Sequence, residues 1–318
     1  MQHHINHRRT TPCRSLAASL ALLAASASGS TGVGTPDHAD QSGISDAAPP
    51  AQIVLTGVVR DFRADHPDFQ RMSRNAAGST AGGLYARMVQ DELGPDGKPV
   101  FRSKGYRVTS QWRNAAGKSI LPFAQDKPYY DVLPSDQMGA TEPLGDAVES
   151  AQTFHQWYRD VPGVNMSKQI PITLVRNAET GTYVFDDRTD PHYAQLGGFF
   201  PINDDLYGNY ENNRNYHFTF ELDTTFTYHA GQNQTFTFDG DDDVWVFIDG
   251  KLVIDLGGLH NRMEQTVELD RLNWLEDGRS YSLKFFFAER HTSDSNFRME
   301  TNMDLRNARL PMTAALYD

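Results

Sequence analysis

Residues 244–256 read VWVFIDGKLVIDL, two apolar runs joined by Asp249-Gly250. An Asp-Gly pair between apolar runs is a strong short-range signal for a β-hairpin, because both residues tolerate the positive φ of a type I′ turn. The run Val244–Ile248 is apolar at every position, which predicts a central strand that is covered on both faces. The stretch therefore predicts a protein that is built around an antiparallel sheet.

The chain on either side of this hairpin adds further strand patterns. Apolar and polar residues alternate over 216–222, which is the period of a half-buried strand, and 53–62 predicts a first strand. Strands are also expected within 266–275, 280–290 and 296–305, whereas short helices are expected only at 78–93 and 146–160. The fold class is therefore mainly β: an antiparallel sandwich or barrel with an elaborated N-terminal part that carries short helices.

The first residues predict a secretory signal peptide. Arg8, Arg9 and Arg14 precede a short apolar run that ends in Ala25-Ser26-Ala27, which is a basic head followed by an A-x-A cleavage pattern. Cys13 lies before the apolar run, which argues against a lipoprotein. We expect cleavage near Ala27 and a protein that is secreted or held at the cell surface.

Composition limits the partners of the exported chain. Removing residues 1–27 takes away three of the 29 Lys and Arg and none of the 41 Asp and Glu, which leaves a formal charge of −15 and no cysteine. That charge argues against nucleic acid as a partner. Residues 28–51 are small, polar and Pro-rich, which predicts a flexible leader. Residues 52–318 are then expected to form one domain, with no membrane span; the oligomeric state stays open.

An acidic cluster stands directly before the hairpin. Residues 239–243 read DGDDD, so four carboxylates crowd against the most apolar strand of the protein. Crowded carboxylates repel one another, and a bound cation would offset that repulsion. Calcium prefers oxygen ligands of this kind, whereas a solvated acidic loop is the alternative.

Five ordered segments resemble one known family. LTGVVRDFRADHPDFQ (55–70), FHQWYRDVPGVN (154–165), GGFFPIND (197–204), the stretch 216–260 and FFFAERHTSDSNFRMET (285–301) are similar to the successive signatures of the fibro-slime domain family. That family is in turn similar to the protective-antigen-type (PA14) β-sandwich superfamily, which includes lectin and adhesin domains. The resemblance implies the same sandwich and, in many members, sugar binding through calcium.

The resemblance also implies a ligand set. In the lectin members, two adjacent aspartates joined by a cis peptide form one calcium loop, and an asparagine with backbone carbonyls on a second loop completes the site. The aspartate pair falls on Asp241 and Asp242, with Asp243 as an additional carboxylate typical of the fibro-slime branch. On the second loop, Asn296 is the expected side-chain ligand and Asp294 the reserve.

Three further residues are candidates for contact with a ligand. His260 and His291 stand in the loops expected beside the acidic cluster, where the alternative is that they only hydrogen-bond those loops. Tyr210 lies in an Asn-rich segment that suits a surface ring able to stack on a sugar, and loop packing is the alternative for it. Trp245 is interpreted as core, and Glu289 and Arg290 as residues that pair structurally. No HExxH or cysteine cluster indicates zinc.

The function expected from these features is binding, not catalysis. Adjacent aspartates on one loop differ from glycosidase carboxylates, which face each other across a substrate, and the sequence has no GxSxG or phosphate-binding motif. We therefore expect an exported calcium-binding module that recognises a carbohydrate or a cell-surface glycan. A structural surface or matrix protein, in which calcium only stabilises the fold, remains the alternative.

Overall fold

The hairpin predicted over residues 244–256 forms in the computed structural model, which describes residues 48–70, 82–121, 124–143 and 145–308. Its turn has φ values of 49° at Asp249 and 78° at Gly250, so both central residues take the positive φ that the Asp-Gly pair predicted. The predicted signal peptide and nearly all of the predicted leader lie outside the described residues.

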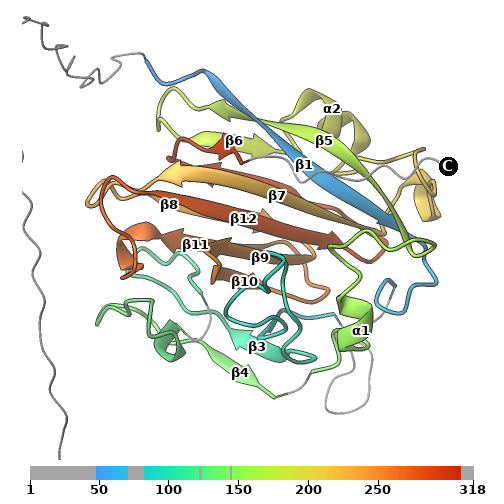
Figure 1. Ribbon diagram of the computed structural model, residues 1–318, viewed down its shortest axis with the longest axis horizontal. Helices are drawn as coiled ribbons and strands as arrows, with labels where there is room; N and C mark the ends of the chain where they lie inside the picture. Colours follow the sequence, from blue (N-terminus) through green and yellow to red (C-terminus); the bar gives the residue numbers. More distant parts are fainter. Residues whose placement is uncertain (1–47, 71–81, 122–123, 144, 309–318) are drawn as a thin grey trace, which may run out of the picture. The chain divides into compact units, whose positions relative to one another are not determined.

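The fold is mainly β, as the alternating patterns predicted (Figure 1). All strand pairs of the larger sheet are antiparallel, and the described part of this sheet has eleven strands in the order β10-β9-β12-β7-β1-β5-β6-β13-β8-β11, with β14 also paired to β7. Its strands are β1 (Gln52–Phe62), β5 (Asn165–Arg176), β6 (Tyr183–Asp186), β7 (Phe218–Thr227), β8 (Thr235–Gly240), β9 (Asp243–Ile248), β10 (Lys251–Leu256), β11 (Met263–Glu268), β12 (Ser280–Glu289), β13 (Phe297–Thr301) and β14 (Arg306–Asn307).

A small sheet and short helices complete the described part of the chain. The order β2-β3-β4 forms a separate three-stranded sheet. These elements are β2 (Tyr85–Ala86), β3 (Tyr106–Ser110), β4 (Ala140–Glu142), α1 (Ala151–Phe154), α2 (Pro191–Leu196) and the 3₁₀ turns η1 (Ala124–Asp126), η2 (Glu211–Asn213) and η3 (Leu269–Arg271). Among the described residues no helix has the length and apolar character that crossing a membrane requires.

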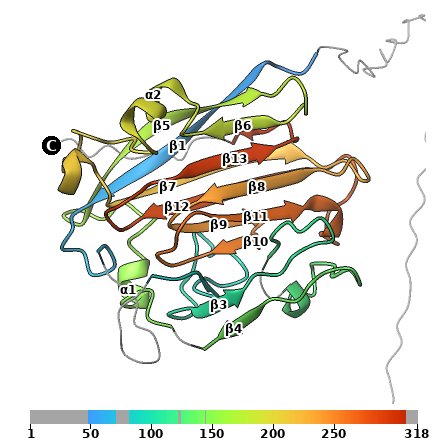
Figure 2. The same ribbon diagram turned by 180° about the vertical axis from the view of Figure 1, so that it is seen from behind.

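The larger sheet curves until its two end strands come close together. Both ribbon views place β10 beside β11 (Figures 1 and 2). The backbone N–H of Asp255 on β10 donates to Oε1 of Gln265 on β11 at 2.7 Å. A side chain therefore bridges the strands where backbone pairing stops, and the sheet is a nearly closed barrel-like sandwich.

Strand β9 is buried on both faces, as its continuous apolar run predicted. Val244, Val246 and Ile248 belong to the core cluster inside the sheet, whereas Trp245 and Phe247 belong to a second cluster on its outer face. All five side chains are fully buried. The interpretation of Trp245 as a core residue is confirmed.

The described residues of 82–148, called the insert below, cover this outer face together with Phe154, Trp157 and Tyr158. In both ribbon views its strands β3 and β4 lie beyond β10 (Figures 1 and 2). The insert also accepts hydrogen bonds from backbone N–H groups of the two end strands of the large sheet. Leu252 N–H on β10 donates to the Asp91 carbonyl at 2.9 Å, and Thr266 N–H on β11 donates to the Ser119 carbonyl at 2.7 Å. Sheet edges that would otherwise attract other strands are therefore covered.

The two predicted helices of the N-terminal part are corrected by the structure. The helix expected at 78–93 is extended chain with β2 in its described part, because its backbone pairs with the residues after β10: Tyr85 and Gly257 exchange N–H···O bonds of 2.6 and 2.8 Å. The helix expected at 146–160 shortens to α1, which Ser150 caps, and turns follow it. Most apolar side chains of both segments are nevertheless buried against the outer face of β9 and β12, whereas Leu84 belongs to the core cluster inside the sheet.

The carboxyl of Asp255 on β10 makes stability depend on pH. It accepts N–H bonds from Arg87 at 2.9 Å and from Trp245 Nε1 at 3.1 Å, yet burial raises its pKa to about 6. A carboxyl whose pKa is higher in the folded than in the unfolded state contributes most below the unfolded pKa, near 4, and that contribution is lost as pH rises through the folded value.

We therefore expect Asp255→Asn to remove this pH dependence. Between pH 4 and 7 the wild-type chain should lose about 2 kcal/mol of stability relative to the variant, because each unit of pKa shift corresponds to about 1.4 kcal/mol. Urea unfolding of both proteins across this pH range measures the difference. Parallel pH curves for the two proteins would contradict the prediction.

Candidate ligand-binding site

A pocket of about 630 Å³ lies at the end of the sheet where the acidic cluster stands. It is formed by the Asp241-Asp242 loop, the loop after β10, the loop between β12 and β13, and the first described residues of the insert. Six of the eight predicted site residues line it: Asp241, Asp242, His260, His291, Asp294 and Asn296. The fold thus brings together residues far apart in the chain, such as Asp241 and Asn296.

Asp241 and Asn296 join the two predicted ligand loops. Asn296 donates to both carboxylate oxygens of Asp241, from its backbone N at 2.7 Å and from Nδ2 at 2.8 Å. Gly240 permits the approach, because a Cβ at this position would lie 2.1 Å from the Asn296 carbonyl oxygen. The Asp241-Asp242 peptide bond is cis, the arrangement that the family resemblance implied.

Asp242 and Glu289 are buried carboxyls next to this junction. Asp242 accepts a hydrogen bond from the backbone N of Arg290 at 3.2 Å, whereas Glu289 Oε2 has no hydrogen-bond partner among the described residues. Burial raises the pKa of both carboxyls well above the usual range. For Asp242 the charge of Arg290 opposes this shift and those of Asp243 and Asp241 add to it, whereas for Glu289 the charges of Asp242 and Asp241 add to it. Burial also raises the pKa of Asp241 to about 6. Three neighbouring carboxyls are therefore held out of water in surroundings that disfavour their negative charge.

Asp243 was expected beside the other two aspartates as a ligand, and its side chain does not line the pocket. Successive residues of a strand point to opposite faces, and the side chain of Asp243 on β9 faces Arg290 instead of the pocket. Its Oδ2 lies 2.5 Å from Arg290 Nε, and its Oδ1 accepts from Gly258 N at 2.6 Å and from Arg290 Nη2 at 3.2 Å. Asp243 is paired with a buried arginine and does not line the pocket, so it has a structural role in this structure.

Arg290 connects this ion pair to the rest of the protein. Its Nη1 donates to the carbonyls of Ala147 at 2.9 Å and Asp68 at 3.1 Å, and its guanidinium lies 4.9 Å from the ring centroid of Trp157. Glu289 and Arg290 were interpreted as residues that pair structurally. Arg290 does so with Asp243, whereas Glu289 has no lysine or arginine partner within the described part of the chain.

The two predicted histidines and an unpredicted arginine form one wall of the pocket. His260 is 8% exposed and its Nδ1 lies 2.9 Å from the Asn261 carbonyl oxygen, while His291 Nδ1 lies 3.2 Å from that of Thr292. Arg262 reaches Asp239 through Nε at 3.0 Å and the Asn296 side-chain oxygen through Nη1 at 3.3 Å. An isolated arginine in a loop carries no motif, so the sequence offered no signal that Arg262 belongs here.

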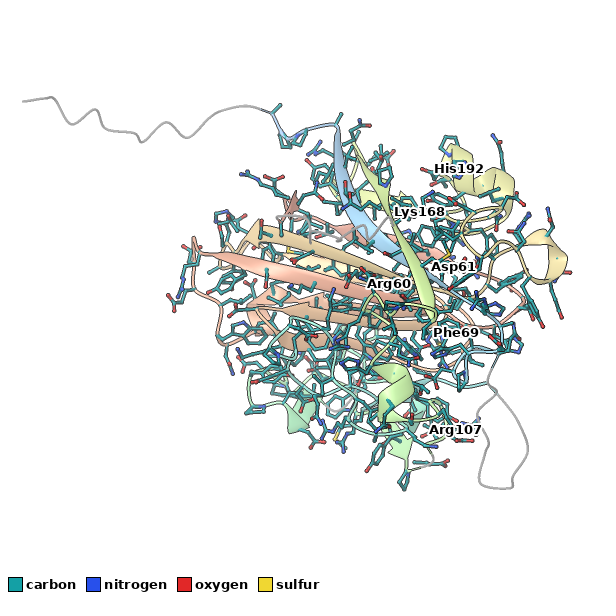
Figure 3. The ribbon with its side chains drawn as sticks, turned by 45° about the vertical axis from the view of Figure 1, so that its right-hand side comes forward. Arg60, Asp61, Phe69, Arg107, Lys168 and His192 are labelled. Atoms are coloured by element: carbon teal, nitrogen blue, oxygen red, sulfur yellow. The ribbon has the colours of Figure 1, made fainter. Side chains whose placement is uncertain are left out.

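Tyr210 is the other predicted site residue that does not line the pocket. Its ring packs edge-on against His217 with centroids 4.9 Å apart. The Asn-rich segment that carries Tyr210 is tied to β1 by Asp61, labelled in Figure 3, which accepts from Tyr207 N at 2.6 Å and Asn215 Nδ2 at 2.8 Å. Local aromatic content predicted a surface ring, and only the tertiary fold shows which surface it occupies.

The fold and the pocket define the class of protein: a PA14-like β-sandwich, a class of module used in carbohydrate binding and adhesion. The PA14 domain family model matches residues 200–310. This range contains the hairpin, the aspartate pair and the Asn296 loop. The matched residues therefore include both loops of the candidate site.

Curated relatives agree with this assignment. Protein psiD of Dictyostelium discoideum is 32% identical over 263 residues, covering 80% of this chain and 42% of that protein. Protein psiJ of the same organism is 38% identical over 232 residues, covering 67% of this chain and 30% of that protein. The chain thus spans less than half the length of these relatives. These matches confirm the predicted resemblance: the chain contains a PA14-like fibro-slime domain.

Solved structures are more distant. The crystal structure of a β-glucosidase from Kluyveromyces marxianus in complex with glucose is similar over 42% of this chain and 16% of that chain, with 13% identity and a TM-score of 0.21. A TM-score this low supports no conclusion about fold or function.

Removing one partner of the Arg290–Asp243 pair should destabilise the fold more than removing both partners. Arg290→Met leaves Asp243 as an uncompensated buried charge, and breaking a buried pair in this way costs about 3–5 kcal/mol. The double variant Asp243→Asn with Arg290→Met removes both charges and should recover part of that loss. Urea unfolding of the two variants and the wild type measures both effects. An unchanged unfolding midpoint for Arg290→Met, or strictly additive losses in the double variant, would contradict this prediction.

Proposed function

We propose that this chain is an exported calcium-dependent carbohydrate-recognition module that acts at a cell surface or in an extracellular matrix. One observation carries the proposal: a single pocket gathers Asp241, Asp242 and Asn296 from two distant loops, and the carboxyls at its base lack cationic partners among the described residues. The signal-like residues 1–27 support the export part of the proposal.

The donor set at the pocket fits calcium. Asp241, Asp242 and Asn296 offer side-chain oxygens, Asp294 lines the same pocket, and calcium takes six to eight oxygen ligands. No three His, Cys, Asp or Glu side chains of the described ranges form a metal cluster by themselves. The ion would therefore rely on the Asn296 amide oxygen, backbone carbonyls and water to complete its ligands.

Local charge supports a divalent cation at this place. Two of the four aspartates of DGDDD pair with an arginine and two do not. Asp239 pairs with Arg262, and Asp243 pairs with Arg290. Asp241, Asp242 and the nearby Glu289 have no lysine or arginine within salt-bridge distance in the described part of the chain. Buried carboxylates without compensation are costly, and calcium would supply the missing positive charge.

Sugar recognition would use the same pocket. Bound calcium would accept ligand hydroxyl oxygens in place of water, and these neutral groups suit an acidic chain. The insert contributes Gly82, Gly83 and Leu84 to the pocket lining, and Gly83 N donates to the Leu259 carbonyl of the loop after β10 at 2.5 Å. The alternative function, in which calcium only stabilises the fold, uses the same residues and differs in predicting no sugar binding.

The proposal assigns binding and no catalysis. Asp241 and Asp242 are adjacent on one loop, and both oxygens of Asp241 are held by Asn296. Glycosidase carboxyls instead face each other from about 5 to 9.5 Å apart across the scissile bond. The pair therefore suits an ion better than a hydrolytic mechanism.

Calcium should stabilise the wild-type chain and fail to stabilise Asp242→Asn. A ligand at a hundred times its dissociation constant adds about 2.7 kcal/mol to the stability of the state that binds it. Thermal unfolding with and without calcium measures the shift in melting temperature. Glu179→Gln is the matched control, because Glu179 is an exposed carboxylate that does not line the pocket, and its variant should keep the wild-type shift. A wild-type melting temperature that is unchanged by calcium would refute the calcium site.

A glycan array separates the lectin from the structural alternative. We expect calcium-dependent binding by the wild-type chain, removal of that binding by a chelator, and at least about a tenfold loss of affinity in Asp242→Asn, which corresponds to about 1.4 kcal/mol. Glu179→Gln should bind as the wild type does. A calcium-induced melting shift without any glycan signal would support the structural role and reject the lectin.

A further inference from the structure

The Asn296 side chain is held from two sides in this structure. Its Nδ2 donates to Oδ2 of Asp241 at 2.8 Å, and its Oδ1 accepts from Nη1 of Arg262 at 3.3 Å. An amide has one donor end and one acceptor end, so a carboxylate on one side and a guanidinium on the other fix which way round it lies. The amide nitrogen therefore faces Asp241, and the amide oxygen faces Arg262.

This orientation is the opposite of the one that a calcium site needs. Calcium takes oxygen ligands, which an amide N–H cannot supply. For Asp241 and Asn296 to share one ion, the amide oxygen has to lie on the side of the Asp241 carboxylate, where Nδ2 lies in this structure. Turning the amide over would bring Nδ2 before Nη1 of Arg262, and two donors would then face each other. The contact with Arg262 is therefore incompatible with the calcium-binding orientation of Asn296.

The sheet holds Arg262 in this position. Arg262 directly precedes β11, and β11 pairs with β8 so that Met263 lies opposite Gly240, the residue before Asp241. Nε of Arg262 donates to Oδ1 of Asp239 on β8 at 3.0 Å. The guanidinium is thus anchored beside the start of the Asp241-Asp242 loop by its own strand and by a carboxylate.

The charge of Arg262 also reaches the candidate ligands. Burial raises the pKa of Asp241, and the positive charge of Arg262 opposes that rise. A charge that favours the negative form of Asp241 repels a cation that this carboxylate binds, because both interactions follow Coulomb's law. Arg262 therefore acts on the same carboxylate that calcium would use.

We propose that Arg262 competes with calcium for Asn296 and Asp241 and so sets the calcium concentration at which the pocket fills. The proposal rests on the function proposed above and gives a role to a residue outside the suggested ligands. Two effects act in the same direction: the bond to the Asn296 oxygen has to break, and the guanidinium repels a divalent cation. A weakened site suits an exported module, since extracellular modules bind calcium with dissociation constants of about 10⁻⁴–10⁻³ M.

A competitor and a purely structural arginine predict opposite changes in calcium affinity. The contacts of Arg262 with Asp239 and Asn296 stabilise the ion-free fold, so both roles predict that Arg262→Met lowers the free energy of unfolding without calcium. A structural arginine would leave behind a less ordered site, which binds calcium more weakly. A competitor would leave behind a freed amide oxygen and less repulsion, so calcium binds more tightly although the fold is less stable.

Arg298→Met is the matched control. The side chain of Arg298 is 22% exposed, against 21% for Arg262, and it contacts the carboxylates of Asp186 at 3.4 Å and Glu300 at 2.5 Å. Its substitution removes one positive charge from strand β13, but Arg298 does not line the pocket. Both variants lose a charge together with its ion pairs, and only Arg262→Met releases the amide of Asn296.

The experiment is titration calorimetry with calcium chloride on the full chain, after treatment with a chelator. We expect Arg262→Met to bind calcium about tenfold more tightly than the wild type, and Arg298→Met to stay within about threefold of it. Arg262→Gln, which is neutral but polar, should shift the affinity in the same direction and serves if Arg262→Met does not fold. Urea unfolding without calcium records the stability of each variant in parallel.

Two outcomes would overturn the competitor. One is a calcium affinity that is unchanged or weaker in the Arg262 variants, and the other is a gain in Arg298→Met as large as the gain in Arg262→Met. Either outcome, with calcium bound by the wild type, rejects the role of Arg262 and leaves the calcium site standing. No calcium binding by the wild type or by any variant rejects the proposed calcium site together with the competitor.

Discussion

The buried ion pair between Arg290 and Asp243 is the contact on which the architecture depends. It joins the end of β12 to the start of β9, and the same guanidinium donates to backbone carbonyls of the insert and of the loop after β1. A charge in the protein interior is tolerated only when its hydrogen bonds are complete, so these segments must meet at one point. The backbone N of Arg290 also donates to Asp242, which couples the packing of the core to the position of a pocket carboxylate.

The insert is the feature that distinguishes this domain from a plain sandwich. A sheet with one apolar outer face and two open ends would expose Trp245, Phe247 and unpaired backbone groups. The insert buries that face, pairs with β10 and β11 at the ends, and supplies Gly82, Gly83 and Leu84 to the pocket. The same segment therefore stabilises the fold and shapes the candidate site.

Some residues of the pocket could be named from sequence motifs, whereas others are recognised only from their tertiary contacts. Asp241, Asp242 and Asn296 could be named from the family resemblance, because the order of the signatures aligns both loops. Asp243 and Tyr210 do not line the pocket, because Asp243 pairs with Arg290 and the Tyr210 ring packs against His217. Arg262 and Glu289 carried no local motif that marks a pocket, and they become part of the site only through their contacts and burial.

The sequence by itself determined the β class, the 244–256 hairpin with its Asp-Gly turn, the double burial of β9 and the identity of the acidic loop. These features follow from local periodicity and turn chemistry, which act over a few residues. Tertiary structure alone decided that the predicted helix at 78–93 is extended chain, because pairing with the residues after β10 outweighs helical propensity there. It also decided which carboxylates are compensated by arginine and which face the pocket, since ion pairs between residues far apart in the chain depend on how the sheet closes.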